Sequence, residues 1–303
     1  MRNQLTAAGA AHVQVQRATD DAVRARSMLA ITLRRLRRSH TAMLGLCIVV
    51  LLLLVAVLAD VVAPYSPTQT TSNSLSTPTW QHPMGTDLLG RDVLSRVIHG
   101  SRVSVYVGVV ATLLGTVLGV PLGLVAGFYG GRLDNLIMRL MDVLLAFPIF
   151  LLAIVIMVIL TPSVTNVVLA LAIVRIPILA RIVRGCVLSV RENDYIEAVK
   201  ALALSQTRVL GRHVLPNCLA PIIVTSTLNI GTAIIIEAPL SFLGLGTQPP
   251  TPTWGWDLKQ NLTLIEINPW ITIFPGLAIL VAVLAFNLLG DGLRDALDPR
   301  LKA

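Results

Sequence analysis

The sequence has 303 residues, of which 54% are hydrophobic and only 13% are charged. Soluble domains carry about 25% charged residues, and the mean hydropathy here is +0.76, so the composition excludes an ordinary soluble domain. The formal net charge of +8 would suit a nucleic-acid binder, but aromatic residues make up only 5%. Most of the chain is too apolar to coat a polyanion. The meaning of the net positive charge must therefore come from where the charged residues lie along the chain.

Six stretches are long and apolar enough to cross a bilayer core, which takes roughly 20 residues per helix. They are Met43–Ala63, Val103–Gly127, Asn135–Leu160, Asn166–Ile182, Cys218–Glu237 with a possible extension to Leu245, and Ile271–Leu289. The fourth is the least regular, because Arg175 interrupts it and Pro177 follows. The first is too long for a cleavable signal and lacks a small-residue cleavage site. The pattern predicts an all-α, polytopic membrane protein with six transmembrane helices.

The basic residues predict how these helices are oriented. Six spans place both termini on one side, and nineteen of the 24 Lys and Arg residues fall on that side, against four on the other and Arg175 inside a span. Cytoplasmic loops carry an excess of Lys and Arg, so we expect both termini to be cytoplasmic. The nineteen are the eight arginines within residues 1–42, then Arg132, Arg139, Arg181, Arg184, Arg191, Lys200, Arg208, Arg212, Arg294, Arg300 and Lys302.

Composition divides the chain into five parts. We expect a cytoplasmic tail at 1–42, a first transmembrane helix at 43–63, a periplasmic loop at 64–100, a transmembrane core at 101–290 and a cytoplasmic tail at 291–303. Within the first tail, Ser27–Ser39 is a basic amphipathic segment that either lies on the lipid surface or only stops transfer. Within the periplasmic loop, Thr86 and Asp87 precede apolar residues at helical spacing, which predicts a short separate helix along the outer interface.

The second span carries glycines at four-residue intervals, Gly115, Gly119, Gly123 and Gly127. Such a strip lets a neighbouring helix backbone approach closely, which drives helix association in lipid. We expect this strip to be a packing surface, with a kink at Pro121.

The loop 184–217 is the largest internal cytoplasmic segment. Asp194 and Glu197 have the spacing of a capping box at the start of a helix, and a second short helix is expected from Ser205 to a stop before Pro216. This helical pair has no evident apolar core of its own, so it needs a partner in which to dock.

The residues of this loop resemble a known motif. Tyr195–Val199 followed by His213–Asn217 is similar to the EAA loop of ABC importer permeases. Three further segments, at 82–96, 241–252 and 286–300, narrow the resemblance to the dipeptide/oligopeptide/nickel permease family, in the subunit type called DppC or OppC. The similarity extends from about residue 35 to residue 302.

The resemblance implies a type I ABC importer permease fold, in which this loop forms the coupling helix that inserts into a groove of the ATPase subunit. The corresponding residues are Tyr195, Glu197, Ala198, Ala203, His213 and Pro216. Glu197 either only closes its capping box or also contacts the ATPase. The family usually has Gly at the position of Ala203, and a left-handed conformation there would cost Ala on the order of 1 kcal/mol.

The chain has no phosphate-binding loop of its own, since none of Lys200, Lys259 and Lys302 follows a glycine. We therefore expect no enzyme activity, metal or cofactor in this chain. The resemblance implies that ATP and Mg are bound by two separate ATPase subunits (DppD/DppF-type). It also implies a second permease (DppB/OppB-type), an extracytoplasmic peptide-binding protein and a place in the bacterial inner membrane. The implied cargo is a di- or oligopeptide, with nickel or another small solute as the alternative.

Two charges lie inside predicted spans, Glu237 and Arg175, and each costs roughly 2.5–3.5 kcal/mol if placed centrally. One hypothesis is that Glu237, with Arg175 and Asn229, lines the translocation pathway or its outer gate. The alternative, which we favour, is a structural pair of Glu237 with Arg175 or with Asn229. Near the inner end of the third span, Arg139 and Asp142 are expected to form an ion pair along one helix.

Two other classes of function fit less well. A membrane-embedded enzyme lacks support, because the sequence has neither G-x-S-x-G nor H-E-x-x-H. A secondary transporter would use Pro-broken spans, but six spans without a second half and with a protruding loop do not suit it. The cysteines Cys47, Cys186 and Cys218 are interpreted as packed small hydrophobes. Trp254, Trp256 and Trp270 either help to position the binding protein on the outer loops or, as we favour, form an aromatic belt at the interface.

Overall fold

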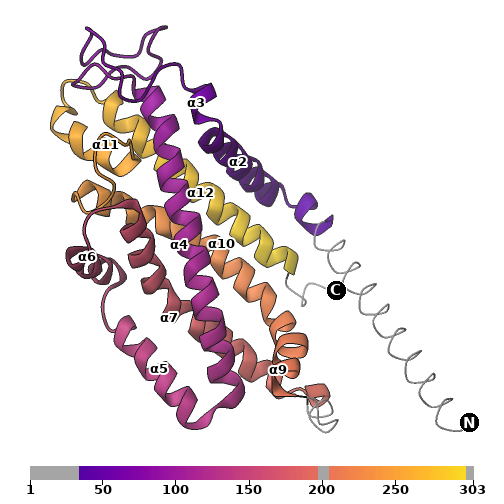
Figure 1. Ribbon diagram of the computed structural model, residues 1–303. Helices are drawn as coiled ribbons and strands as arrows, with labels where there is room; N and C mark the ends of the chain where they lie inside the picture. Colours follow the sequence, from indigo (N-terminus) through magenta and orange to yellow (C-terminus); the bar gives the residue numbers. More distant parts are fainter. Residues whose placement is uncertain (1–33, 197–204, 298–303) are drawn as a thin grey trace, which may run out of the picture.

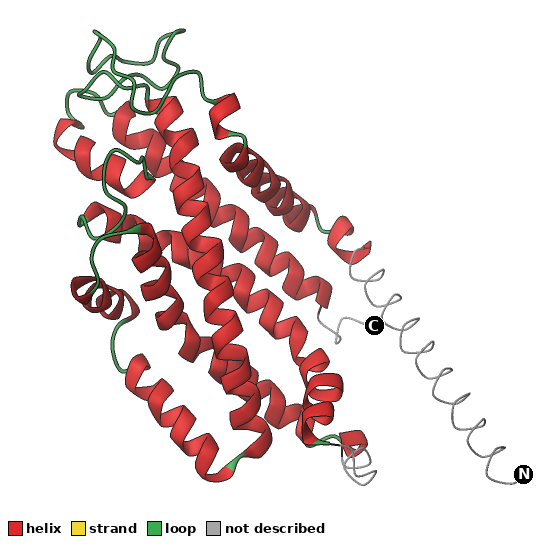
Figure 2. Cartoon of the chain, in the orientation of Figure 1, coloured by secondary structure: helices red, strands yellow, loops and turns green. Residues whose placement is uncertain are grey.

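The computed structural model describes residues 34–196 and 205–297. Figure 2 shows that these residues form helices and loops, and the only bridges among them are two isolated ones, Thr70 with Arg91 and Thr86 with Asp92. The helices make an elongated bundle with a cap of loops at one end (Figure 1). We use "cap" for residues 64–92 and 246–269, and "loop end" for the opposite end of the bundle.

The bundle begins with α2 (His40–Val57) and α3 (Ala59–Val62). Ser39 caps α2 by accepting a hydrogen bond from the Ala42 amide at 3.3 Å. Helix α2 packs along α12 (Trp270–Leu297), and Gly45 is small enough to allow this, since a Cβ there would lie 2.6 Å from the Leu289 nitrogen. Most of the predicted basic segment Ser27–Ser39 lies outside the described residues.

Helix α4 (Val93–Tyr129) is a single helix of 37 residues that spans the bundle from the cap to the loop end (Figure 1). Asp92 caps it, accepting from the Ser95 amide at 2.7 Å. The prediction of a separate interfacial helix is wrong, because residues 93–100 form the first two turns of α4. No proline separates them from the membrane-spanning part, so the intrahelical hydrogen bonds continue.

The third predicted span is also not one helix. It divides into α5 (Gly131–Leu145) and α6 (Ile149–Ile159), which meet at an angle of 89°. Pro148 explains the break, because proline lacks an N–H and disfavours helical dihedrals in the residue before it, here Phe147. Asn135–Leu160 is therefore a broken span or a re-entrant segment.

Helix α7 (Val164–Arg191) continues unbroken through both Arg175 and Pro177. It is the most enclosed helix: 61% of its most apolar window is buried, against at most 39% in the other long helices. The glycine strip of α4 lies against it. A Cβ at Gly123 would lie 2.4 Å from the Ala180 oxygen, and one at Gly127 would lie 2.8 Å from the Val187 Cβ. The two backbones therefore pack at a distance that only glycine permits.

After the loop, α9 (Gln206–Val209), a π-helical turn (Leu210–Val214) and α10 (Leu215–Phe242) follow one another without a gap. The expected stop before Pro216 is wrong. Pro216 lies in the first turn of α10, where its missing N–H costs little, and the wider π turn puts the Leu215 amide on the Leu210 oxygen, five residues back.

The chain then forms α11 (Trp254–Asn261) and a short 3-10 turn (Leu262–Leu264) before α12. Five helices are long and apolar enough to cross a membrane, or six if α5 and α6 count as one broken span. The predicted all-α, polytopic class is confirmed, while the sidedness of the termini stays a prediction.

Candidate functional site

The loop end is the first candidate site, because it holds the motif residues of the predicted coupling loop. Tyr195, just past α7, lies against the start of α10: its hydroxyl donates to the His213 oxygen at 3.4 Å and accepts from Asn217 Nδ2 at 3.0 Å. Asn217 Nδ2 also donates to the His213 oxygen at 2.6 Å. These contacts hold together the two ends of the loop. Glu197, Ala198 and Ala203 lie outside the described residues.

An apolar cluster supports these polar contacts. Ile196 and Val214 are fully buried and Val209 is nearly so, together with Cys218 from α10 and Phe128 from the end of α4. The expectation that this segment has no apolar core was wrong for its described flanks. They share a core with the adjoining ends of α7 and α10 and with the end of α4. The contact with α4 could not be read from local sequence, because Leu124 and Phe128 lie about 70 to 90 residues before these flanks.

The intramembrane polar residues form two separate groups. Arg175 donates from Nη1 to Asn229 Oδ1 at 2.9 Å, between α7 and α10. Glu237 accepts from Ser104 at 3.1 Å and from Ser241 at 2.7 Å, and is 1% exposed. The favoured pairing of Glu237 with Arg175 or Asn229 is therefore wrong. Two serine hydroxyls, which cost little to bury beside a carboxyl, take the place of the expected charged partner.

Ion pairs near the loop end join α7 to α5. Arg184 makes a two-pronged contact with Asp134, at 2.6 and 2.7 Å, and Arg181 contacts Asp142. The predicted pair of Arg139 with Asp142 is wrong, because the neighbouring helix supplies the closer arginine. Arg139 forms no ion pair with any residue that the structure describes.

The cap is held by buried charges that the sequence analysis did not connect. Arg96, at the start of α4, contacts Asp257 of α11 through Nε at 3.1 Å and through Nη2, across 161 residues. Its Nη1 also donates to the Pro67 oxygen at 3.1 Å. The side chains of Arg96 and Asp257 are both nearly fully buried. Breaking such a pair costs about 3–5 kcal/mol, so it fixes the cap on α4.

Further polar contacts order the cap loop. His82 Nδ1 lies 2.9 Å from Asp92 Oδ1, and Arg91 binds Asp87 at 2.6 Å and Gln260 at 2.9 Å. Apart from Gln260 of α11, these residues belong to the 82–96 segment that carried the family resemblance. In the structure their contacts order the loop around the start of α4.

Trp254 is not part of an aromatic belt. It is 1% exposed, and its indole N–H donates to the Val97 oxygen at 2.9 Å. Its ring lies over Gly100, where a Cβ would be 2.9 Å from the indole. The belt prediction failed for Trp254 because a glycine in α4 opens a place for the ring inside the cap.

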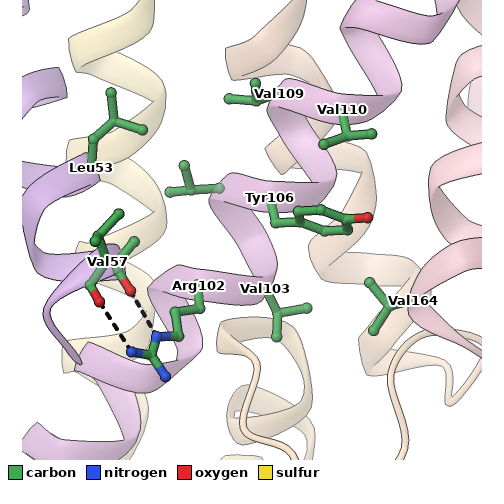
Figure 3. A pocket seen from close by; sticks show the side chains of 10 residues that line it. Leu53, Val57, Arg102, Val103, Tyr106, Val109, Val110 and Val164 are labelled. Atoms are coloured by element: carbon green, nitrogen blue, oxygen red, sulfur yellow. Dashed lines mark hydrogen bonds between the residues drawn. The ribbon is translucent and has the colours of Figure 1, made fainter. Parts of the chain in front are cut away.

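One groove lies between α2 and α4, with a volume of about 570 Å³ and a lining of apolar side chains (Figure 3). Its single charged residue, Arg102, turns away to donate to the Ala56 and Val57 oxygens at 2.7 and 3.1 Å. Arg102 also binds Asp60 at 2.8 Å, and this hydrogen bond holds the pKa of Asp60 below its ordinary value. Arg102 therefore caps the end of α2 and leaves the groove apolar.

Comparisons with known proteins agree with this architecture. The family model described as "binding-protein-dependent transport system inner membrane component" matches residues 119–303. A second model, the N-terminal transmembrane domain of oligopeptide transport permease C, matches residues 27–78.

Two relatives match over 271 residues, which is 89% of this chain and 89% of theirs. The dipeptide transport system permease protein DppC of Alkalihalophilus pseudofirmus is 45% identical, and the glutathione transport system permease protein GsiD of Escherichia coli is 48% identical. Both are named as permease proteins of transport systems.

A solved structure shares the fold. The MetNI methionine ABC transporter in an inward-facing conformation aligns with a TM-score of 0.56 and 17% identity, over 67% of this chain and 96% of that chain. The predicted type I importer fold and the location in the inner membrane are confirmed. The chain belongs to the binding-protein-dependent ABC importer permeases, in the dipeptide/oligopeptide branch of the DppC/OppC type.

Proposed function

We propose that this permease forms one half of the pathway for uptake of di- or oligopeptides, paired with a second permease of the DppB/OppB type. Two ATPase subunits of the DppD/DppF type would supply ATP and Mg, and an extracytoplasmic peptide-binding protein would deliver cargo. The observation that carries the proposal is the similarity, over 89% of the chain, to permeases named for dipeptide and glutathione transport. Both cargoes are small peptides.

Coupling to the ATPases is proposed to occur through the loop 184–217. Its flanks are fastened to the bundle by the Tyr195–Asn217 contact and by buried Ile196 and Val214. A displacement of the loop would therefore move α7 and α10 as well. Those two helices meet at Arg175 and Asn229, halfway along the bundle. This arrangement supports a mechanical link from the loop to the membrane-spanning core.

The orientation that this requires, with both termini and the loop in the cytoplasm, is supported by the distribution of Lys and Arg along the chain. Only Arg91, Arg96, Arg102 and Lys259 fall in the segments on the cap side, whereas nineteen fall in the segments on the side of the termini and the loop. An excess of Lys and Arg marks the cytoplasmic side, whether or not aspartates pair with some of them.

Transport would then proceed by alternating access. ATP binding favours the outward-open arrangement only if it binds that arrangement more tightly than the other. Glu237 is proposed to act at the outer gate. Its contact with Ser104 joins α10 to α4 on the cap side of the bundle, so an opening between these helices would expose the carboxyl to a peptide amino terminus.

The coupling proposal is tested by co-purification in mild detergent. The charge-reversal variant Glu197→Arg should lose ATPase subunits from the purified complex, while Lys259→Glu, a charge reversal in the cap, should retain them. Retention of the ATPases by Glu197→Arg, with ATPase activity still stimulated by the binding protein, would refute coupling through this residue.

The cargo proposal is tested by uptake into a strain lacking the gene. Radiolabelled dipeptide, glutathione and nickel are supplied separately, and restoration of peptide uptake is the expected result. If only nickel uptake were restored, the cargo would be nickel and not a peptide. The coupling proposal would not be affected by that result.

A further inference from the structure

Four of the five buried polar atoms that lack a hydrogen-bond partner in the described part of the chain belong to three side chains. They are Arg175 Nε and Nη2, Asn229 Nδ2 and Thr112 Oγ1. Arg175 is 3% exposed, Asn229 7% and Thr112 2%. Unsatisfied buried polar groups are rare in proteins, so their concentration in these residues needs an explanation.

The helix packing places the three side chains at one level. Gly108 of α4 faces Ile230 and Ile234 of α10, and two turns later Thr116 lies 3.0 Å from Ser226. Thr112 is midway between these contacts and so lies level with Asn229.

Arg175 joins the same group from the third helix. Gly115, three residues after Thr112, faces Ala172 and Arg175 of α7. The group therefore sits where α4, α7 and α10 meet.

The charge of this group is uncompensated. No carboxylate of the described residues lies within ion-pair distance of Arg175, and Glu237 is bound to two serines about two turns along α10. A guanidinium buried near the middle of a membrane protein is costly unless an anion or a set of acceptors surrounds it.

The chemistry of the free atoms selects the ligand. The N–H groups of Nε and Nη2 point to the same side of the guanidinium and can both donate to one anion, and Nη1 is already used by Asn229. The Asn229 amide nitrogen and the Thr112 hydroxyl add further donors. A bound water would also need acceptors for its own hydrogens, whereas a set made mainly of donors suits an anion.

We propose that Arg175, Asn229 and Thr112 form a binding site for a small monovalent anion, such as chloride, at the junction of α4, α7 and α10. The bound anion neutralises the arginine and holds the three helices together. The site is internal to this chain and does not depend on the identity of the cargo.

The test is the thermal stability of the full-length chain, purified with its accompanying subunits in lipid nanodiscs. It is measured in sodium chloride, sodium bromide and sodium gluconate at equal ionic strength, because gluconate is too large for an internal site. Chloride and bromide should raise the Tm saturably above the gluconate value. At a concentration 100 times the dissociation constant, the unfolding equilibrium should shift about 100-fold.

Arg175→Met should abolish the chloride response, whereas Arg181→Met, which removes an exposed arginine from the same helix, should keep it. Thr112→Val retains the charge, and so serves if Arg175→Met fails to fold; it should weaken the apparent chloride affinity several-fold. Bromide should also give an anomalous diffraction peak beside Arg175. The proposal would be overturned if the Tm were equal in the three salts, or if Arg181→Met lost the chloride response as Arg175→Met does. It would also be overturned if no bromide peak appeared beside Arg175.

Discussion

Replacing Gly123 with alanine should separate α4 from α7. A Cβ at this position would lie 2.4 Å from the Ala180 oxygen and 2.8 Å from the Val183 Cβ. Ordinary contact begins at 3.4 Å, so the helices must move apart by about 1 Å, since backbone atoms cannot rotate away. Overpacking of this kind typically costs about 1–3 kcal/mol. We expect a loss of about 2 kcal/mol, or roughly a 30-fold change in the unfolding equilibrium.

Gly185→Ala is the matched control. Gly185 is on α7, and a Cβ there would meet nothing within 4 Å. Alanine is favoured over glycine in a helix by up to about 1 kcal/mol, so this variant should be neutral or slightly stabilised. Both are measured by reversible unfolding in mixed micelles. If Gly123→Ala were as stable as Gly185→Ala, the close approach of the two helices would not govern their association.

Three further predictions concern the buried polar groups. Glu237→Gln keeps the volume but replaces the carboxyl with an amide, so we expect reduced peptide uptake with intact folding; transport and ATPase stimulation at wild-type levels would refute the role of Glu237 at the gate. Arg96→Met leaves the Asp257 carboxyl buried without its partner and should destabilise the protein by about 3–5 kcal/mol. The double variant Arg96→Met/Asp257→Leu should recover most of this, and a failure to recover would mean that the pair is not what holds the cap. Arg102 lowers the pKa of Asp60 below its ordinary value of 3.8. The contribution of this carboxylate to the stability of the fold is therefore present above about pH 4 and is lost as pH falls through the lowered pKa. Asp60→Asn should remove the part of the pH dependence of the Tm below pH 4 that comes from this carboxylate. A Tm profile unchanged from the wild type would contradict this assignment.

The parts of the fold that follow from local sequence were predictable. Hydropathy located five of the six spans, because a membrane helix must be apolar along its whole length. The third span failed at Phe147-Pro148, where a local backbone restriction outweighs an apolar pattern on both sides. The continuity of α4 was missed because polar residues such as Arg96 and His99 made its first turns resemble a surface helix, whereas Arg96 is buried by a partner far along the chain.

The partners of buried charges could not be predicted in the same way. Glu237 had charged candidates in sequence, but its actual contacts, Ser104 and Ser241, are short side chains that carry no hydropathy signal. Asp142 had an arginine one turn away and instead contacts Arg181 on another helix. Ser241 lies one turn from Glu237 on the same helix. The contacts of Glu237 with Ser104 and of Asp142 with Arg181 instead depend on the relative rotation of two helices, which a single sequence does not encode locally.

The unbroken α4 has a consequence for the timing of transport. At 1.5 Å per residue its 37 residues measure about 55 Å, so it reaches from the cap contacts of Arg96 to the apolar cluster beside the loop. If α4 tilts as one body by about 10° around its middle, with no bending at Pro121, its two ends move by about 5 Å in opposite directions. Events at the two faces of the membrane would then be simultaneous parts of one rotation, with no relay of separate steps between them.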